Sequence, residues 1–316
     1  MISITIANRI RIQPTVPSIT QELTEKRLLF PPAFLPENVM YETIMGSYAF
    51  GVSTDHSDRD IYGFCIPPKE DVFPHFAGEI PGFGTQRKRF EQFQKHHVLD
   101  ENAAGGRGLQ YDLSIYSIVR YFELCMENNP NMIDSLFTPH DCVLHVTAVG
   151  HLVRDHRTKF LHKGCWPKFK GYAYSQLHKM RSKQPIGKRK ELREEFGFDV
   201  KFAYHTIRLL LECEQILMHC DIDLRRDREH LKAIRRGEVS QGEIFQMASE
   251  KERHLEKLYH ESRIPAGPDE SQLKELLLNC LEQHYGNLDA CITRVDANTI
   301  ALKEITEIVD RVRSRI

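Results

Sequence analysis

The sequence predicts an α+β protein, with a small mixed β-sheet and helices in its first half and a helical domain after them. Short apolar runs typical of strands flank a polar stretch at residues 46–63. From Leu144 onward, apolar residues recur at helical spacing almost without interruption. A chain of 316 residues is long enough for two domains of roughly 100–200 residues each. We therefore predict one domain over residues 1–145 and a helical domain over residues 146–316.

The first half is expected to alternate between short strands, turns and helices. Residues 69–108 combine glycine, phenylalanine and charge without a clear period, which predicts loops around a functional face. The remaining elements follow from apolar alternation, helix caps and proline or glycine breaks. Strands are expected at 2–6, 41–44, 59–66 and 110–115, and helices at 18–27, 116–127 and 132–137.

The second half is predicted to be helical because its apolar positions repeat every three to four residues between short breaks. Glycine, proline and short polar turns separate the segments. The expected helices span residues 146–160, 168–182, 200–219, 226–237, 241–263, 270–286 and 297–315.

Composition excludes several classes of protein. No apolar run approaches the about 20 residues of a membrane helix, so no membrane partner is expected. The 8 cysteines form no C-x-x-C pair and predict reduced thiols. The first residues have neither a basic leader nor a small-residue cleavage site. Together these observations predict a cytoplasmic protein.

The polar stretch 46–63 carries the chemistry. Asp58 and Asp60 are one residue apart at the start of an expected strand, so both carboxylates would point to the same side. Two such charges repel each other unless a cation lies between them, and hard divalent cations prefer carboxylate oxygens. Gly46 and Ser47 follow the preceding strand and would allow close approach of a phosphate. The stretch therefore predicts a site for a metal-bound nucleoside triphosphate.

The same residues carry a family resemblance. The pattern Gly46-Ser47, Gly51 and Asp58-x-Asp60 resembles the signature of the polymerase-beta-type nucleotidyltransferases. Over about residues 40–270 the chain resembles the members associated with RNA ligases and assigned to RNA repair. Two further sequences support this narrower resemblance: Asn129-Pro130-Asn131 and Lys201-Phe202-Ala203-Tyr204-His205.

The resemblance implies roles for individual residues. Gly46 and Ser47 would hold the triphosphate, and Asp58 and Asp60 would be catalytic ligands of two Mg²⁺ ions, or of Mn²⁺ in their place. A third carboxylate usually completes such a site, and Asp112 is the candidate. Asp100, Glu101 and Asp134 are alternatives.

The implied reaction moves a nucleotidyl group from an NTP to a hydroxyl, with an RNA end as the expected acceptor and an RNA ligase as a functional partner. Residues 1–145 would form the catalytic domain, and residues 146–316 would contribute to nucleotide and acceptor binding.

Two cationic segments of the helical half are candidate contacts. Lys201, His205 and Arg208 are spaced i, i+4, i+7 on an otherwise apolar helix, so we expect them to bind the NTP. They could instead pair with acidic residues of neighbouring helices. The basic segment 168–193 also contains aromatic residues, which suits contact with a polynucleotide or triphosphate, although such runs are commonly solvated faces.

Two other functions remain open at this point. The nucleotidyl group could go to a protein or small molecule instead of RNA. Alternatively, the chain could be a non-catalytic RNA-binding module whose affinity depends on the cations of the helical half and falls steeply with salt.

Overall fold

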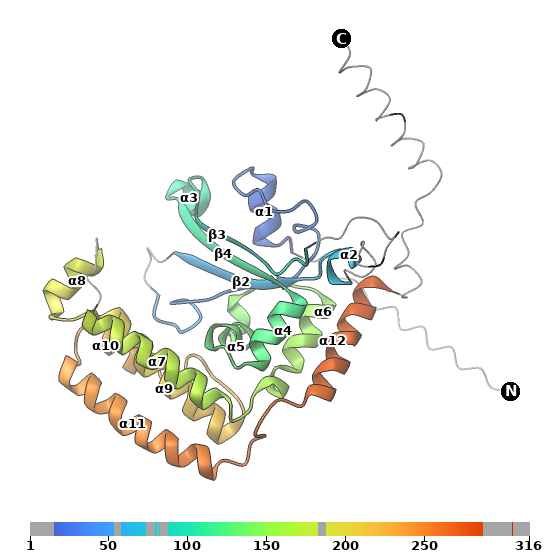
Figure 1. Cartoon of the computed structure of the whole chain (residues 1–316). Coiled ribbons are helices and arrows are strands. Elements are labelled where there is room, and N and C mark those ends of the chain that lie inside the picture. Colours follow the sequence, from blue (N-terminus) through green and yellow to red (C-terminus); the bar gives the residue numbers. More distant parts are fainter. Residues whose placement is uncertain are drawn as a thin grey trace, which may run out of the picture.

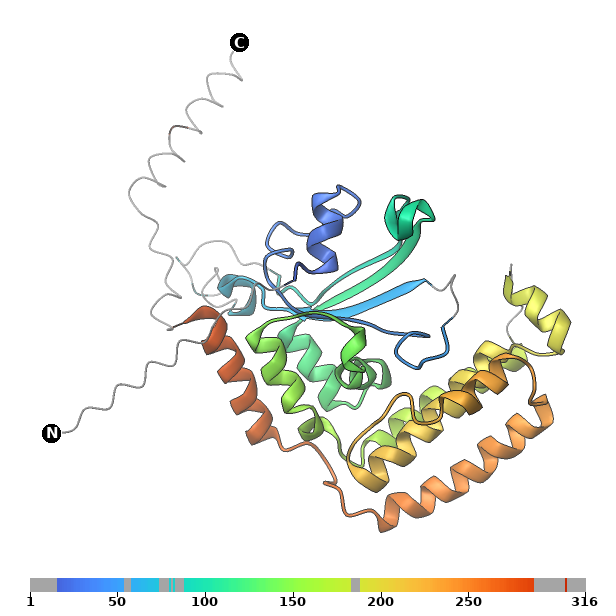
Figure 2. The same ribbon diagram turned by 180° about the vertical axis from the view of Figure 1, so that it is seen from behind.

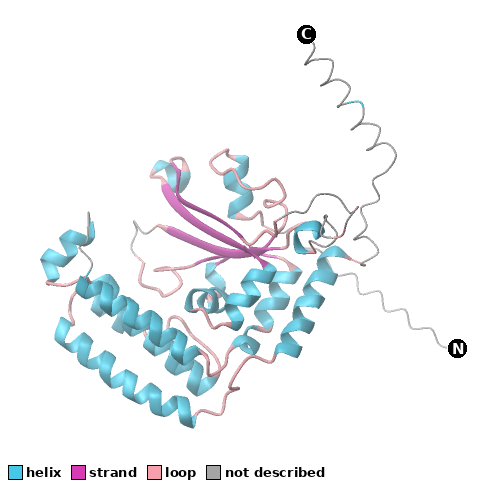
Figure 3. Ribbon diagram, in the orientation of Figure 1, coloured by secondary structure: helices cyan, strands magenta, loops and turns pink. Residues whose placement is uncertain are grey.

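The computed structural model describes residues 16–53, 58–73, 80, 82, 88–182, 188–286 and 305. One β-sheet lies against helices, and a further group of helices extends to one side (Figures 1 and 3). The predicted α+β class, with a largely helical second half, is confirmed.

The sheet has five strands in the order β3-β4-β2-β1-β5. β2 and β4 are parallel neighbours, whereas the other adjacent pairs are antiparallel. The strands are β1 (Val39–Ile44), β2 (Arg59–Cys65), β3 (Gln92–Asp100), β4 (Leu109–Ser117) and β5 (Val143–Val146). The sheet is therefore mixed, as predicted.

Alternating side chains give the sheet two apolar faces. Ile61 and Leu113 pack into a smaller cluster that also contains residues of the α1 side, such as Leu23. Phe64 and Tyr116 point the other way, into a larger cluster shared with most of the helices. Even-numbered residues of β2 and β4 therefore face the helical half.

Helices cover both faces of the sheet (Figure 2). On the smaller cluster, α1 is tied to β1 because the buried Glu42 accepts hydrogen bonds from the backbone of Ile19 and Thr20 at 2.6 and 3.2 Å. The helices around the sheet are α1 (Ile19–Glu25), α4 (Ile118–Met126), α5 (Pro130–Phe137), α6 (Ala148–Asp155) and α12 (Glu270–Tyr285). Short turns are α2 (Lys69–Val72), α3 (Ala103–Gly106), η2 (His140–Cys142) and η3 (Arg157–Phe160).

A group of longer helices forms the remainder. Its central member, α9 (Val200–His219), begins at Asp199, whose carboxylate accepts hydrogen bonds from two backbone N–H groups of the first turn. A capping box at Ser240 and Glu243 starts α11. The other members and their bounds are α7 (Cys165–Ser182), α8 (Lys188–Phe196), α10 (Arg228–Arg235) and α11 (Gln241–Glu261).

Several predicted elements differ from the structure. Residues 69–108 contain β3, so the loop prediction was wrong there, and the helix expected from 146 is preceded by β5. The strand expected at 2–6 lies outside the described residues, as does all but Ile305 of the helix expected at 297–315.

The larger apolar cluster crosses the predicted domain boundary. It joins Tyr41 and Phe64 of the sheet to Ile207 of α9 and Leu276 of α12 without interruption. Within the described residues, no helix combines the length and apolar character needed to cross a bilayer.

Candidate active site

The predicted phosphate-holding residues lie in a tight turn directly after β1, here called the glycine turn (residues 46–52). Gly46 and Gly51 have φ angles of +62° and +65°, in the left-handed region that favours glycine. The backbone N–H groups of Gly51 and Val52 donate to Tyr48 and Ser47 carbonyls at 3.0 and 2.8 Å. These bonds fold the turn back on itself.

The glycine turn lies against Asp60. The backbone N–H of Met45 donates to the carbonyl oxygen of Asp60 at 2.7 Å. A side chain at Gly46 would overlap the Asp60 carboxylate, so only glycine fits there without displacement. The structure therefore packs Gly46 directly against Asp60.

Asp60 and Asp112 lie opposite each other in the parallel pair β2–β4. Both follow the alternation of Phe64 and Tyr116, so both point to the helical side of the sheet. Burial raises the pKa of Asp60, and the negative charges of Asp112 and Asp58 raise it further, whereas Lys201 and His96 lower it. Both of the other predicted carboxylates thus act on Asp60 electrostatically.

Two histidines beside Asp112 were missed by the sequence analysis. A register shift between Lys95 and Val98 interrupts β3. The backbone N–H of His97 donates to Asp112 at 2.7 Å, and Nδ1 of His96 lies 3.6 Å from the same carboxylate. The only available sequence signal was the pair His96-His97 itself, in a segment predicted to be loop.

The alternatives to Asp112 lie elsewhere. Asp100 is buried and paired with Lys26 at 2.8 Å, whereas Asp134 is buried against Arg208. Glu101 is exposed in the turn after β3. Within the described ranges, no three His, Cys, Asp or Glu side chains are already close enough together to hold a metal ion. Asp112 remains the candidate third carboxylate.

Lys201 and His205 both lie on α9. Lys201 is exposed in the first turn, and its charge lowers the pKa of Asp60, although burial and Asp112 outweigh it. His205 is half-buried, with its ring centre 4.7 Å from that of Tyr204. The structure therefore places the charge of Lys201 where it acts on Asp60.

Arg208 differs from the expectation that it faces a nucleotide. Its side chain is buried and bonded to Asp134 at 2.5 Å and to Glu212 at 2.8 and 3.0 Å. The guanidinium also lies 4.1 Å from the centre of the Phe50 ring in the glycine turn. Arg208 is thus paired with acidic residues, which is the alternative that the sequence left open. Its contact with the glycine turn is through the Phe50 ring.

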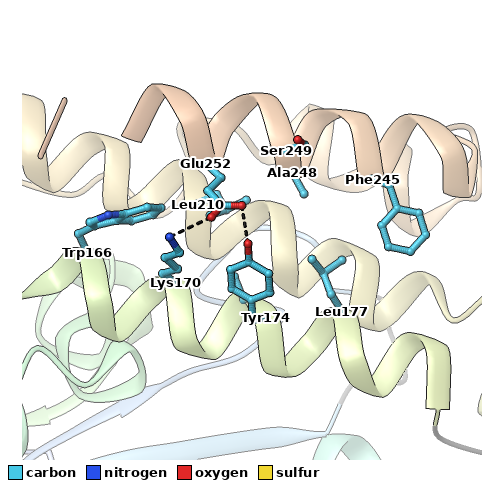
Figure 4. Close-up of a pocket in the computed structure, with 10 residues that line it drawn as sticks. Trp166, Lys170, Tyr174, Leu177, Leu210, Phe245, Ala248, Ser249 and Glu252 are labelled. Atoms are coloured by element: carbon cyan, nitrogen blue, oxygen red, sulfur yellow. Dashed lines mark hydrogen bonds and ion pairs between the residues drawn. The ribbon is translucent and has the colours of Figure 1, made fainter. Parts of the chain in front are cut away.

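The basic segment on α7 is partly neutralised by acidic neighbours. Lys170 pairs with Glu252 of α11 at 2.9 Å, and the Tyr174 hydroxyl donates to the same carboxylate (Figure 4). These residues border a cavity of about 260 Å³ between α7, α9 and α11, whose lining contains none of the predicted site residues. Phe169 is buried in the core, which removes it from base stacking. A polynucleotide contact on this segment stays a prediction.

Replacement of Gly46 by alanine is expected to remove activity and lower stability. The left-handed backbone costs a residue with a side chain roughly 1–2 kcal/mol, and the new methyl group would displace the Asp60 carboxylate. Thermal unfolding and a nucleotidyl-transfer assay measure the two effects. Gly171→Ala is the matched control, because Gly171 is exposed in α7 with open space around it. The free energy of unfolding of that variant should be about 1 kcal/mol higher than that of the wild-type protein.

Comparison with known proteins identifies a family for most of the chain. Residues 17–278 match the model of the family described as the RNA repair pathway DNA polymerase beta family. An uncharacterised 38.9 kDa protein of Enterobacteria phage T4 is 24% identical over 123 residues, which cover 38% of this chain and 32% of the phage protein.

Among solved structures, a nucleotidyltransferase-like protein from Exiguobacterium sibiricum aligns with a TM-score of 0.27 and 10% identity. The alignment covers 83% of this chain and 72% of that protein. The family match spans most of the chain and includes the glycine turn, both strand carboxylates and α9. The chain therefore belongs to the RNA repair pathway DNA polymerase beta family.

Proposed function

We propose that this protein is a metal-dependent nucleotidyltransferase that moves a nucleotidyl group from an NTP to the hydroxyl of an RNA end. The observation that carries the proposal is the pairing of Asp60 with Asp112 across parallel strands, next to a glycine turn. Membership of a polymerase-beta family assigned to RNA repair supports both the reaction class and the RNA acceptor.

The chemistry of the donor set suits divalent cations. Burial raises the pKa of Asp60, and the negative charges of Asp112 and Asp58 add to this effect, so the ionised form of Asp60 is disfavoured in the metal-free protein. A cation between Asp60 and Asp112 would relieve that repulsion, and carboxylate oxygens are preferred by Mg²⁺ and Mn²⁺. Asp58, Asp60 and Asp112 would hold the metal. When bound, such ions lower the pKa of an attacking hydroxyl and neutralise a leaving pyrophosphate.

The chain's own groups would position the substrates. Gly46 and Ser47 would approach the triphosphate, because the absence of a side chain at Gly46 lets the turn pack directly against the Asp60 carboxylate. Lys201 would supply positive charge near the same carboxylates. The acceptor oxygen forms a bond to the α-phosphorus, the bond to pyrophosphate breaks, and the hydroxyl proton passes to solvent. No covalent protein intermediate is required.

Incubation with labelled nucleotides tests the proposal. The purified protein would be given each of the four NTPs labelled at the α-phosphate, Mg²⁺ and short RNAs with defined ends. Label should appear in the RNA with one or more NTPs, together with released pyrophosphate. An NTP labelled at the γ-phosphate is the matched control, because it should leave the RNA unlabelled.

A parallel incubation with protein and small-molecule pools tests the acceptor. Label in one of those pools but not in RNA would move the proposal to a different acceptor. If no NTP labels any pool, with Mg²⁺ or with Mn²⁺ present, the enzymatic proposal would be overturned. RNA binding that persists without Asp58 and Asp60 and weakens steeply with salt would then favour a non-catalytic module.

A further inference from the structure

Two arginines of the helical half hold the backbone of the glycine turn. Arg225 precedes α10, and its guanidinium donates to the carbonyl oxygens of Tyr48 and Ala49, both at 3.3 Å. Arg235, the last residue of α10, donates to the carbonyl oxygen of Val52 at 2.6 Å. The loop between β1 and β2 reaches toward these helices in both views of the ribbon (Figures 1 and 2).

Arg225 is itself fixed by contacts behind the turn. Its Nη1 lies 2.8 Å from the carboxylate of Asp141, and its Nη2 lies 3.3 Å from the sulfur of Cys142. The stem of Arg225 also passes Gly51, where an added methyl group would meet it at 3.6 Å. The arginine therefore connects the segment before β5 to the glycine turn.

Arg235 lies over the ring of Tyr204 on α9. Its guanidinium lies 5.7 Å from the centre of the Tyr204 ring. Tyr204 in turn packs edge-on against Phe50, with ring centres 6.4 Å apart. Arg235 thus reaches the turn from α10, while α9 supports the Phe50 side chain.

From these contacts we infer that Arg225 and Arg235 are positioning residues that set the glycine turn for the triphosphate. In a planar trans peptide, the C=O and the following N–H point in opposite directions. Because the arginines hold the carbonyls of Tyr48, Ala49 and Val52, the next N–H groups point away from the arginines. Of these, the N–H of Phe50 donates to the carbonyl oxygen of Gly46 at 3.3 Å and helps to close the turn. The two guanidinium groups also offset the negative ends of these carbonyl dipoles, which would otherwise repel a phosphate.

The inference rests on the proposed function, because it assumes that the turn receives an NTP. Its test combines one measurement on the free protein with one on nucleotide affinity. The variants are Arg225→Met, Arg235→Met and the double variant, which remove the donors but keep an apolar stem. Arg236→Met is the matched control, since Arg236 is exposed and pairs only with the exposed Glu238 among the contacts described.

Hydrogen exchange of backbone amides in residues 46–53 is expected to speed up roughly tenfold or more in the double variant, with the amides of α9 unchanged. The dissociation constant of a non-hydrolysable NTP should rise about tenfold, whereas kcat at saturating NTP should change less than twofold. Arg236→Met should leave all three quantities unchanged, and Arg235→Lys should restore part of the affinity.

Unchanged exchange in the double variant would overturn the inference, and so would faster exchange with unchanged nucleotide affinity. A wild-type protein that binds the nucleotide analogue but transfers no label would overturn the proposed reaction alone. A wild-type protein that binds no nucleotide would overturn both.

Discussion

Asp60→Asn is expected to reduce nucleotidyl transfer by roughly 1,000-fold, which corresponds to about 4 kcal/mol of transition-state stabilisation. The substitution keeps the size of the side chain beside Gly46 but removes the charge that would bind the metal. Single-turnover kinetics with labelled NTP and a short RNA measure the loss.

The same variant should be at least as stable as the wild-type protein without metal. Burial raises the pKa of Asp60, as do Asp112 and Asp58, so the ionised form lowers the free energy of unfolding at pH values above the ordinary Asp pKa. Relative to wild type, Asp60→Asn should gain stability at neutral pH. The gain should shrink as the pH is lowered through the raised pKa toward about 4, the ordinary value.

Addition of Mg²⁺ and NTP separates the metal role from the fold. The wild-type protein should unfold at a higher temperature with both present, because ligands that bind the folded state stabilise it. Asp60→Asn should not respond. Asp155→Asn is the matched control, since Asp155 is exposed on α6. Normal transfer by Asp60→Asn would contradict the proposed role of Asp60 in holding the metal.

Arg208→Met is expected to destabilise the protein by about 3–5 kcal/mol, the usual effect of removing one partner of a buried ion pair. Arg208 serves both Asp134 and Glu212, and all three side chains are buried. Burial lowers the pKa of Arg208, but the two carboxylates more than offset this. Without the guanidinium, two buried acids lose their cation. Urea unfolding measures the free-energy difference.

The loss of stability in Arg208→Met should depend on pH. Burial raises the pKa of both Asp134 and Glu212 even with Arg208 present, and the variant removes the charge that opposes this rise. The folded variant would then bind more protons than its unfolded chain, so its stability should fall as the pH rises. The loss relative to wild type should be larger at pH 8 than at pH 5.

Neutral side chains in place of the two acids should restore stability to the Arg208→Met variant. In the Arg208→Met background, Asp134→Asn with Glu212→Gln should recover much of the lost stability, because no buried charge remains unpaired. Arg236→Met should leave the free energy of unfolding nearly unchanged, as expected for an exposed pair. An unperturbed Arg208→Met protein would show that the buried network does not stabilise the fold.

The success of individual predictions follows from the strength of the local signal. The bounds predicted for α9 agree with the structure because its apolar positions repeat over five turns and Asp199 caps its start. β3 was missed because it lies at the sheet edge and most of its first six residues are exposed, so its sequence lacks apolar alternation. The short strand β5 also lies at an edge and is only half-buried.

The site illustrates the same limit. Asp58 and Asp60 could be paired from their spacing, but Asp112 reaches Asp60 only through the parallel pairing of β2 with β4. That pairing depends on a crossover that includes β3, the strand that the sequence did not reveal. Helical spacing placed Arg208 on the same helix as Lys201, yet it could not show that Asp134 of α5 would neutralise it.

The uninterrupted apolar cluster has a consequence for how the candidate site can be lost. Phe64 of the sheet and Ile207 of α9 belong to the same apolar cluster, so their contacts are expected to be lost together on unfolding. Asp60 and Asp112 are therefore expected to lie opposite each other only while the helices that share this cluster are folded as well. A substitution deep in α9 would lower the fraction of molecules with a competent site, and would resemble an active-site defect in any assay that counts turnover alone.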